Sequence, residues 1–216
     1  MRQNPSFALG DVEEIKRLIR ENPWALLVSQ TSNGLVASHY PVLLDESCEE
    51  ISILTHLGRP DDQVHELGRH ELLVVVQGPH GYVSPGWYDE RPAVPTWNFV
   101  AAHLTGVPVL LSDEENWEVL GRLVDRFEER MAAPRRMADT PENEAYAARL
   151  LSGTVGVRLT PTRIVAKNKM SQNRAPEIVG TIIAELEGDG PYADARLAAE
   201  MRRTHARLGR ELPPAP

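Results

Sequence analysis

Alternating hydrophobic and polar positions dominate the first half of the chain and predict β-strands. Runs rich in β-branched and aromatic residues cover residues 24–30, 35–44, 51–56, 71–78 and 96–111. Asn33-Gly34 lies between the first two runs and favours the positive φ angles of a tight hairpin turn. Because these runs follow one another without regular helical crossovers, the pattern predicts an antiparallel barrel or sandwich.

Helical spacing begins at two capping boxes. Asp11 with Glu14 predicts the start of a short amphipathic helix, which Pro23 ends. Ser112 with Glu115 predicts a longer helix that runs to about residue 131. Its inward face is expected to carry Trp117, Leu120, Leu123, Val124 and Phe127.

The last third mixes helices with one strand. A helix is expected over 142–151, a strand over 154–166, and a helix from Pro176 through Leu186. The residues expected to face inward on that helix are Ile178, Ile182, Ile183 and Leu186. The sequence therefore predicts an α+β fold, mainly antiparallel β, with peripheral helices and a helical C-terminus. Residues 1–190 are expected to form one domain, and residues 191–216 a C-terminal helix and tail packed on the same domain or on a partner subunit.

Charge works against nucleic acid as a partner. The 216 residues carry a formal charge of -8 and a pI near 5.4, whereas contact with a phosphate backbone needs a basic face. A locally basic stretch near the end is typical of a solvated helix face or a partner contact. It contains Arg196, Arg202, Arg203, Arg207 and Arg210.

Neither a membrane segment nor thiol chemistry is indicated. No apolar run reaches the ~18 residues of a membrane span, and the first residues lack the basic-then-apolar character of a signal peptide. These features predict a cytoplasmic protein with no membrane partner. The single cysteine, Cys48, has no neighbour with the spacing of a zinc or redox motif.

Four histidines lie in or beside strand-like apolar runs: His39, His56, His80 and His103. A lone histidine of this kind is usually hydrogen-bonded within the core, but a buried neutral imidazole needs partners for both ring nitrogens. No pair has the spacing of a dedicated two-histidine metal site. Core packing and a ligand role both remain open.

The turn after the third strand-like run combines several anion-binding groups. The strand ends at His56, Gly58 allows a close turn, and Arg59 projects a permanent cation. A short helix is expected to begin near Asp61, and a helix N-terminus beside an arginine binds phosphate or carboxylate. The alternative is an ordinary turn with Asp61 as N-cap, since Asp61 and Asp62 would repel a phosphate dianion.

Aromatic and cationic side chains gather in two further segments. Residues 78–88 and 95–99 are rich in proline and glycine and present five aromatic rings, which suit a flat ring system or an interface. These rings are Tyr82, Trp87, Tyr88, Trp97 and Phe99. The polar run 167–174 carries Lys167, Lys169 and Arg174, which either reach an acidic group or form a solvated hairpin end.

Taken together, these segments resemble the PaiB family of FMN-binding negative transcriptional regulators. The matching segments are NPSF (4–7), ENPWALLVS (21–29), GLVASHYPVLL (34–44), THLGR (55–59), GPHGYVSPGWY (78–88), VPTWNFVAAH (94–103) and KMSQNR (169–174). The resemblance implies a split β-barrel of the FMN-binding type that works as a homodimer with cofactor sites between subunits.

One segment departs from the family pattern. Where relatives commonly read HLARANPQW, this chain reads HLGRPDDQVH, so Val64 replaces a tryptophan, and Asp61, Asp62 and His65 are gained. The enlarged space and the added imidazole resemble the haem-dependent piperazate synthase branch, which implies haem b as cofactor and FMN as the alternative.

That branch implies a cyclase that converts N5-hydroxy-L-ornithine to L-piperazic acid by attack of the α-amine on the hydroxylated nitrogen. The axial haem ligand would be His65 or His56, and the catalytic residues would be Asp61, Asp62, His56 and Lys167. The cofactor-binding residues would be Arg59, His80, Tyr82, Trp87, Trp97, Lys169, Gln172, Asn173 and Arg174. The alternatives are a PaiB-type FMN-binding regulator and a flavin-dependent oxidoreductase.

Overall fold

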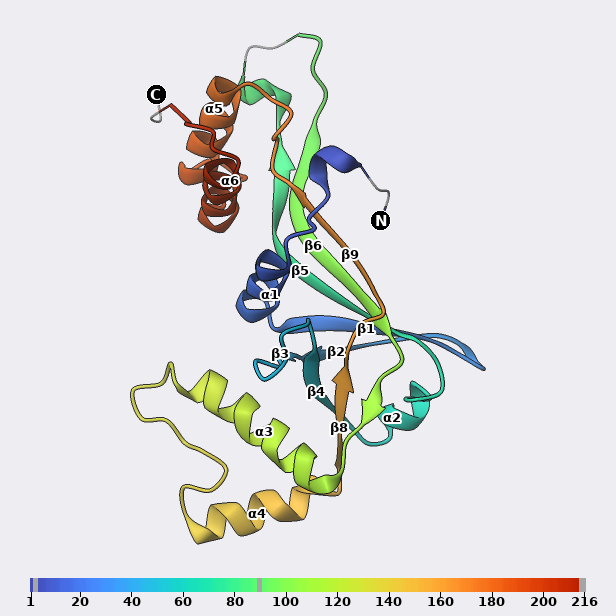
Figure 1. The fold of residues 1–216 in the computed structure, drawn as a ribbon. Coiled ribbons are helices and arrows are strands. Elements are labelled where there is room, and N and C mark those ends of the chain that lie inside the picture. The colour runs from blue at the N-terminus through green and yellow to red at the C-terminus, as the bar shows by residue number, and fades with distance from the viewer. Residues whose placement is uncertain (2–3, 89–90, 214–216) are drawn as a thin grey trace. The chain divides into compact units, whose positions relative to one another are not determined.

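The computed structural model describes residues 1, 4–88 and 91–213, and Figure 1 shows the order of its elements. The first half contains η1 (Pro5–Phe7), α1 (Val12–Glu21), β1 (Trp24–Thr31), β2 (Gly34–Pro41), β3 (Leu43–Leu44), β4 (Ile53–Gly58), α2 (Asp61–Val64), β5 (Leu72–Val83), η2 (Pro85–Trp87) and β6 (Thr96–Gly106). The second half contains β7 (Val109–Leu110), α3 (Asp113–Glu128), α4 (Pro141–Leu151), β8 (Thr154–Leu159), β9 (Arg163–Lys169), α5 (Pro176–Glu187) and α6 (Ala195–Arg207). Residues 214–216 of the predicted tail lie outside the described residues.

The strands form two sheets. One has the order β2-β1-β5-β6-β9 and the other the order β3-β4-β8-β7. The pairs β1–β2, β1–β5, β3–β4, β4–β8 and β7–β8 are all antiparallel. The predicted hairpin joins β1 to β2, but its two turn residues are Ser32 and Asn33, and of the Asn33-Gly34 pair only Gly34, the first residue of β2, has a positive φ (+110°). The predicted mainly antiparallel α+β fold is confirmed.

Three predicted strands are each broken in two, and a proline lies in the break or directly before it. The run 35–44 divides after Pro41 into β2 and β3, which belong to different sheets. The run 96–111 divides at Pro108, and the run 154–166 at Pro161. Proline has no N–H to donate to a neighbouring strand, so the ladder ends there even though the hydrophobic pattern continues.

The predicted inward face of α3 is partly wrong. The buried residues are Asn116, Val119 and Leu123, whereas Phe127 is 42% exposed and Trp117 is half-buried. The buried face of α3 is narrower than predicted, because a helix that is only partly covered buries only the residues that contact the sheet. The buried Asn116 is a polar residue that the hydrophobic pattern passed over.

The chain divides into two compact units. The histidine unit comprises Asp11–Val76 and Ala102–Ile164, and the aromatic unit comprises Met1–Gly10, Gln77–Ala101 and Val165–Pro216. The sequence-based division into residues 1–190 and 191–216 stays a prediction.

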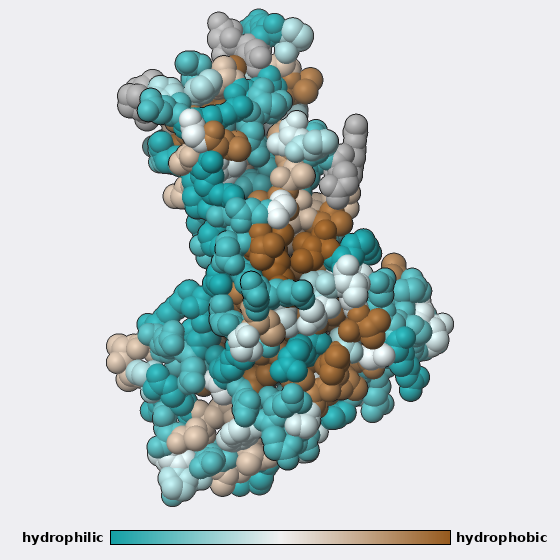
Figure 2. Space-filling view, viewed as in Figure 1, coloured by the Kyte–Doolittle hydropathy of each residue, from teal (hydrophilic) through white to brown (hydrophobic). Residues whose placement is uncertain are grey.

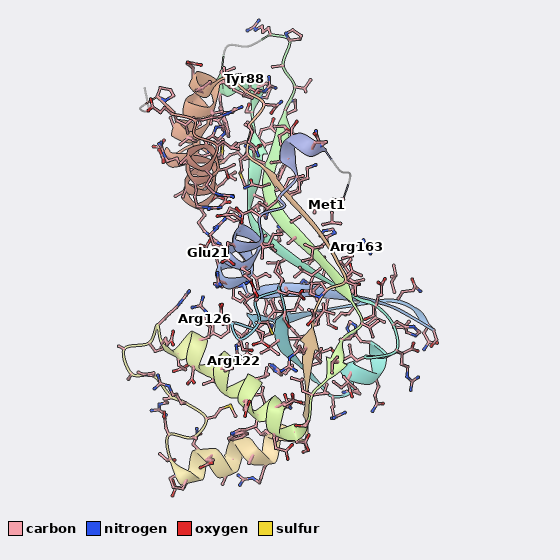
Figure 3. All side chains as sticks on the ribbon, viewed as in Figure 1. Met1, Glu21, Tyr88, Arg122, Arg126 and Arg163 are labelled. Carbon is pink, nitrogen blue, oxygen red and sulfur yellow. The ribbon has the colours of Figure 1, made fainter. Side chains whose placement is uncertain are left out.

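The core of the histidine unit lies between α3 and the sheet that contains β4. Its buried cluster comprises Leu43, Leu54, Leu111, Val119 and Leu123. Two arginines project from α3 (Figure 3), and they donate hydrogen bonds to main-chain carbonyls, Arg122 to Leu44 at 3.4 Å and Arg126 to Arg20 at 3.0 Å. These bonds fix α3 against α1 and β3.

In the aromatic unit, α5 packs against α6. The buried side chains of α5 include Val179, Ile182, Ile183 and Leu186, so the predicted face is right except that Val179 takes the place of the half-buried Ile178. Figure 2 shows that exposed apolar residues gather over the strands, while the helices present a mainly hydrophilic surface. Within the described ranges, no helix is both long and apolar enough to cross a membrane.

Candidate functional site

The turn after β4 holds its charged groups in pairs. Arg59 forms an ion pair with Asp62 at 2.6 Å, so its charge is already neutralised. Asp61 accepts hydrogen bonds from Tyr40 Oη at 2.8 Å and Ser38 Oγ at 3.1 Å, and it is not the N-cap of α2, which is Pro60. A phosphate at this turn would meet two carboxylates and an arginine that is already paired. The turn is therefore a poor site for a dianion.

His65 is 1% exposed and both of its ring nitrogens are hydrogen-bonded. Nδ1 lies 2.8 Å from Ser29 Oγ, and Nε2 lies 3.0 Å from Ser38 Oγ. Because Ser38 gives its single hydrogen to the Asp61 carboxylate, Nε2–H must donate to Ser38 and Nδ1 must accept from Ser29. Burial lowers the pKa of His65 more than the nearby Asp61 raises it, so the ring is neutral.

His56 has the opposite character. It lies on β4 opposite Gly156 of β8, and Tyr40 meets its ring edge-on at a centroid distance of 6.1 Å. Its Nδ1 is buried without a partner among the described residues, and burial lowers the pKa of the ring. A neutral imidazole with an unused nitrogen is a suitable metal ligand. Hydrogen bonding thus favours His56 over His65 as the ligand.

The other histidines of this unit are His39, His70 and His103, and burial lowers the pKa of His103. His39 stacks on Trp24 with ring centroids 6.1 Å apart, and His70 contacts Glu66 at 2.9 Å. Among the residues the structure describes, no group of three or more metal-ligating side chains could hold a bare metal ion.

The aromatic unit gathers the rings that the sequence singled out. Trp97 Nε1 donates to His80 Nδ1 at 3.2 Å, and their rings stack with centroids 6.0 Å apart. Tyr82 meets Trp97 edge-on at 6.3 Å and contacts Tyr192 at 4.9 Å, and Trp87 lies 6.5 Å from Tyr192. Trp97 is 50% exposed. Together these five residues form an aromatic platform of the kind that binds a flat ring.

Sequence reasoning missed Tyr192, although it completes this platform. It lies in the short connection between α5 and α6, where a single aromatic residue has no periodicity. The preceding Gly190-Pro191 marks a turn and gives no sign of what the turn contacts.

Three cations lie beside the platform and are held by aromatic rings or by the backbone. Lys169 donates to Thr96 Oγ1 and, at 2.9 Å, to the Trp97 carbonyl. Burial, with Lys167 and Arg174 nearby, lowers the pKa of Lys169. Lys167 lies over the rings of Phe99 (5.5 Å) and Phe7 (5.8 Å), and Arg174 lies over Tyr88 (5.8 Å). These cations can pair with a carboxylate.

The SQNR loop is a structured loop, not a solvated hairpin end. Gln172 accepts a hydrogen bond from Met170 N and donates one to the Asn168 carbonyl, both at 2.6 Å. The buried Ser171 pairs with Asn98, and His205 of α6 contacts the Met170 carbonyl at 3.0 Å. Asn173 is exposed. The Gln172 side chain is therefore engaged within its own loop.

The predicted site residues thus fall into two groups. One group, in the histidine unit, comprises His56, Arg59, Asp61, Asp62 and His65. The other group, in the aromatic unit, comprises His80, Tyr82, Trp87, Trp97, Lys167, Lys169, Gln172, Asn173 and Arg174. Their roles remain predictions.

The two-sheet, mainly antiparallel α+β architecture is the fold of a split barrel. The model of a family described as "Putative FMN-binding domain" matches residues 1–163, and the chain belongs to this family. The resemblance to PaiB-like proteins is confirmed. "Protease synthase and sporulation protein PAI 2" of Bacillus subtilis is 29% identical over 189 residues, which cover 85% of this chain and 87% of that protein.

Two solved structures share the fold. The FAD and haem binding protein from Mycobacterium smegmatis has a TM-score of 0.55 at 18% identity, covering 74% of this chain and 72% of that one. The flavocytochrome Anf3 from Azotobacter vinelandii has a TM-score of 0.56 at 15% identity, covering 92% and 77%. The predicted split-barrel fold is confirmed.

Proposed function

We propose that this chain is a haem-dependent cyclase that forms an N–N bond, converting N5-hydroxy-L-ornithine to L-piperazic acid and water. The observation that carries the proposal is the donor set at the end of β4, where a neutral imidazole with an unbonded nitrogen, His56, stands beside an arginine that Asp62 already neutralises. FMN needs a site for its phosphate, whereas haem needs an axial nitrogen. The residues present fit haem better than FMN.

His56 would be the residue that holds the haem iron, with His65 as the alternative. His56 can use a nitrogen that no protein group occupies, whereas His65 would have to exchange its hydrogen bond to Ser38. When bound, haem supplies a Lewis acid that makes hydroxide a better leaving group from the N-hydroxylated nitrogen. Val64, which is 49% exposed, is smaller than the tryptophan that the family pattern implies at this position.

The residues of the chain would accept a proton from the substrate, and cationic side chains can pair with a carboxylate. The α-amine must be neutral to attack, and Asp61, held by Ser38 and Tyr40, is a fixed carboxylate that can accept the ammonium proton. The α-nitrogen forms the N–N bond as the N–O bond breaks, and the departing hydroxide takes up a proton to become water. In the aromatic unit, considered by itself, Lys167, Lys169 and Arg174 are cations that can pair with a carboxylate.

A flavin site is the second candidate, and the family description favours it. In that case the aromatic platform would stack on an isoalloxazine ring, and the chain would act as a flavin oxidoreductase or as a regulator. The formal charge of -8 disfavours a regulator that contacts DNA by itself. The homodimer implied by the family resemblance belongs to either candidate, and light scattering of the purified protein tests it.

An absorbance spectrum of protein purified from cells supplied with a haem precursor separates the candidates. Haem binding gives a single intense Soret band at about 400 nm, and flavin gives two weaker bands. The haem-loaded protein should then convert N5-hydroxy-L-ornithine to a product smaller by one water, detected by mass spectrometry. A flavin spectrum, or a haem protein that leaves this substrate unchanged, would overturn the proposal.

Three single variants identify the ligand. His56→Ala should lose or shift the Soret band, His65→Ala should do so only if His65 binds the iron, and His70→Ala is the matched control because His70 is exposed on the same unit. A full, unshifted band in both His56→Ala and His65→Ala would refute the ligand assignment.

A further inference from the structure

A cleft lies between α1, β3 and α3 within the histidine unit. Its volume is about 370 Å³, which lies within the range of about 300–1,000 Å³ that is usual for small-molecule sites. The residues that line it include none of those assigned above to haem, to flavin or to the cyclase reaction. The cleft is therefore a separate candidate site.

Positive and negative side chains line the cleft in equal number. They are Arg20, Arg122, Arg126, Glu46, Asp125 and Glu129. A dianion such as phosphate would gain little here, because the three carboxylates repel it while the three arginines attract it. The balance favours a ligand that carries one charge of each sign.

Most of these charges already have a partner. Arg20 donates two hydrogen bonds to the Glu46 carboxylate, at 2.7 and 2.9 Å. Asp125 accepts from Arg136 Nε at 2.8 Å. Arg122 lies 3.5 Å from the buried carboxylate that directly follows β3. These four side chains are therefore less available to a ligand.

Arg126 and Glu129 are the two remaining charges, and neither has an ion-pair partner within the part of the chain that the structure describes. Arg126, labelled in Figure 3, donates one N–H to the Arg20 carbonyl at 3.0 Å, which fixes the guanidinium and leaves its other N–H groups for a ligand. Glu129 directly follows α3, is exposed, and still has helical backbone angles.

The spacing of these two residues suits a zwitterion. Helix positions three apart are neighbours, with Cβ atoms about 5–6 Å apart. The ammonium and carboxylate groups of an α-amino acid are attached to one carbon atom, so they can reach the two side chains together. Arg126 would bind the carboxylate, for which the planar guanidinium is well shaped, and Glu129 would bind the ammonium group.

The wall that α1 and the chain before β3 contribute is apolar. It includes Ile19, Pro23 and Val42. Ile19 and Val42 are 0% and 1% exposed, whereas Pro23 is half-buried, so a ligand reaches only the outer part of this wall. A short apolar side chain fits that surface, while a polar one would lose hydration without gaining a hydrogen bond.

We propose that this cleft binds an α-amino acid with a compact apolar side chain, of which valine is an example. Arg126 binds the carboxylate, Glu129 binds the ammonium group, and the side chain lies against Pro23. The substrate of the proposed cyclase carries a polar N-hydroxylated side chain, which the apolar wall disfavours. The inference therefore goes beyond the proposed function and does not depend on which cofactor the chain binds.

An NMR titration of the ¹⁵N-labelled 216-residue chain with L-valine tests the proposal. Backbone signals of α1 and α3 should shift and saturate with a Kd of about 1 mM, because partly exposed charge pairs contribute little to affinity. Isovalerate lacks the ammonium group and isobutylamine lacks the carboxylate, so each should bind about tenfold more weakly than valine. L-Threonine, which has the shape of valine with a hydroxyl in place of a methyl group, should also bind more weakly.

Two variants assign the charges. Arg126→Gln and Glu129→Gln should each weaken valine binding about tenfold. Glu129→Gln should leave isovalerate binding unchanged, and Arg126→Gln should leave isobutylamine binding unchanged, which a purely structural role would not predict. Arg130→Gln, at an exposed arginine outside the cleft, is the matched control and should bind valine like the wild type.

Several outcomes would overturn the proposal. They are the absence of saturable shifts at valine concentrations tenfold above the expected Kd, shifts confined to the residues around His56, and inorganic phosphate that binds more tightly than valine. Circular dichroism identifies a variant that fails to fold, and the comparison of valine with its analogues on the wild type then decides. A chain without a Soret band refutes the proposed function and leaves this result unaffected.

Discussion

The two units of this protein organise their candidate groups in opposite ways. In the histidine unit, neutral imidazoles are buried, and a chain of hydrogen bonds links Ser29, His65, Ser38 and Asp61. In the aromatic unit, half-exposed rings stack on one another beside cations. Buried polar networks are costly to disturb, whereas exposed rings contribute little to stability and remain available to a ligand. We therefore expect substitutions in the histidine unit to lower the stability of the fold, and substitutions in the aromatic unit to change ligand binding.

The largest effect is expected from His65→Ala. It removes a buried ring and leaves Ser29 without its partner, so the free energy of unfolding should fall by about 3–5 kcal/mol. Urea unfolding measures this against His70→Ala, the exposed control. A loss below about 1 kcal/mol would show that the buried chain is not a stabilising network.

The next largest effect is expected from Asn98→Ala, which tests whether the aromatic unit has a rigid part of its own. Asn98 is buried and bonds Ser171 at the start of the SQNR loop, so Asn98→Ala should reduce the free energy of unfolding by about 2 kcal/mol. Asn173→Ala, at an exposed position in the same loop, should be neutral. Equal losses of unfolding free energy in Asn98→Ala and Asn173→Ala would contradict the view that the buried Asn98 stabilises this loop more than the exposed Asn173.

A smaller effect follows from pH. Burial lowers the pKa of His56 and of His65, so below their unfolded pKa of about 6.5 the unfolded chain binds more protons than the folded one. Stability should be constant above that pH and fall by up to about 1.4 kcal/mol per pH unit per histidine below it. Urea unfolding between pH 8 and pH 5 tests this, and His56→Gln should show a shallower slope. Slopes that match in both proteins would mean that His56 does not contribute.

The smallest effect on stability is expected from Trp97→Ala. Half of its surface is already exposed, so unfolding should change by about 1 kcal/mol or less. If a planar cofactor binds the platform as proposed, its spectrum should shift, because the platform loses the ring that contacts both His80 and Tyr82. A large loss of stability with an unchanged spectrum would reverse the contrast between the two units.

Local features of the fold were predictable from the sequence. The hairpin between β1 and β2 and the Ser112–Glu115 capping box depend on residues a few positions apart, and both form, although the turn residues of the hairpin are Ser32 and Asn33. Strand ends were less predictable. The hydrophobic pattern continues across Pro108 and Pro161, but backbone pairing does not, because proline has no N–H to donate.

The sequence identified the segments that carry the candidate site residues, but it did not identify which residues contact them. The turn around His56 and the rings of residues 78–99 were recognised because they concentrate unusual residue types in short segments. Tyr192, which contacts Tyr82 and Trp87, lies in the connection between α5 and α6, where a single aromatic residue carries no local signal. The hydroxyls of Ser29 and Tyr40 were missed for the same reason, since alternation marks them only as strand residues.

The hydroxyl of Ser38 gives the buried chain of hydrogen bonds a direction. It has one hydrogen and stands between a carboxylate and an imidazole, so the charge on Asp61 decides which way every hydrogen in the chain points. If Asp61 takes up a proton, Ser38 is released from donating to it, and the hydrogens on Ser38, His65 and Ser29 can reverse together. The hydroxyl hydrogen of the buried Ser29 would then change direction in response to protonation of the half-buried Asp61, although no water reaches Ser29.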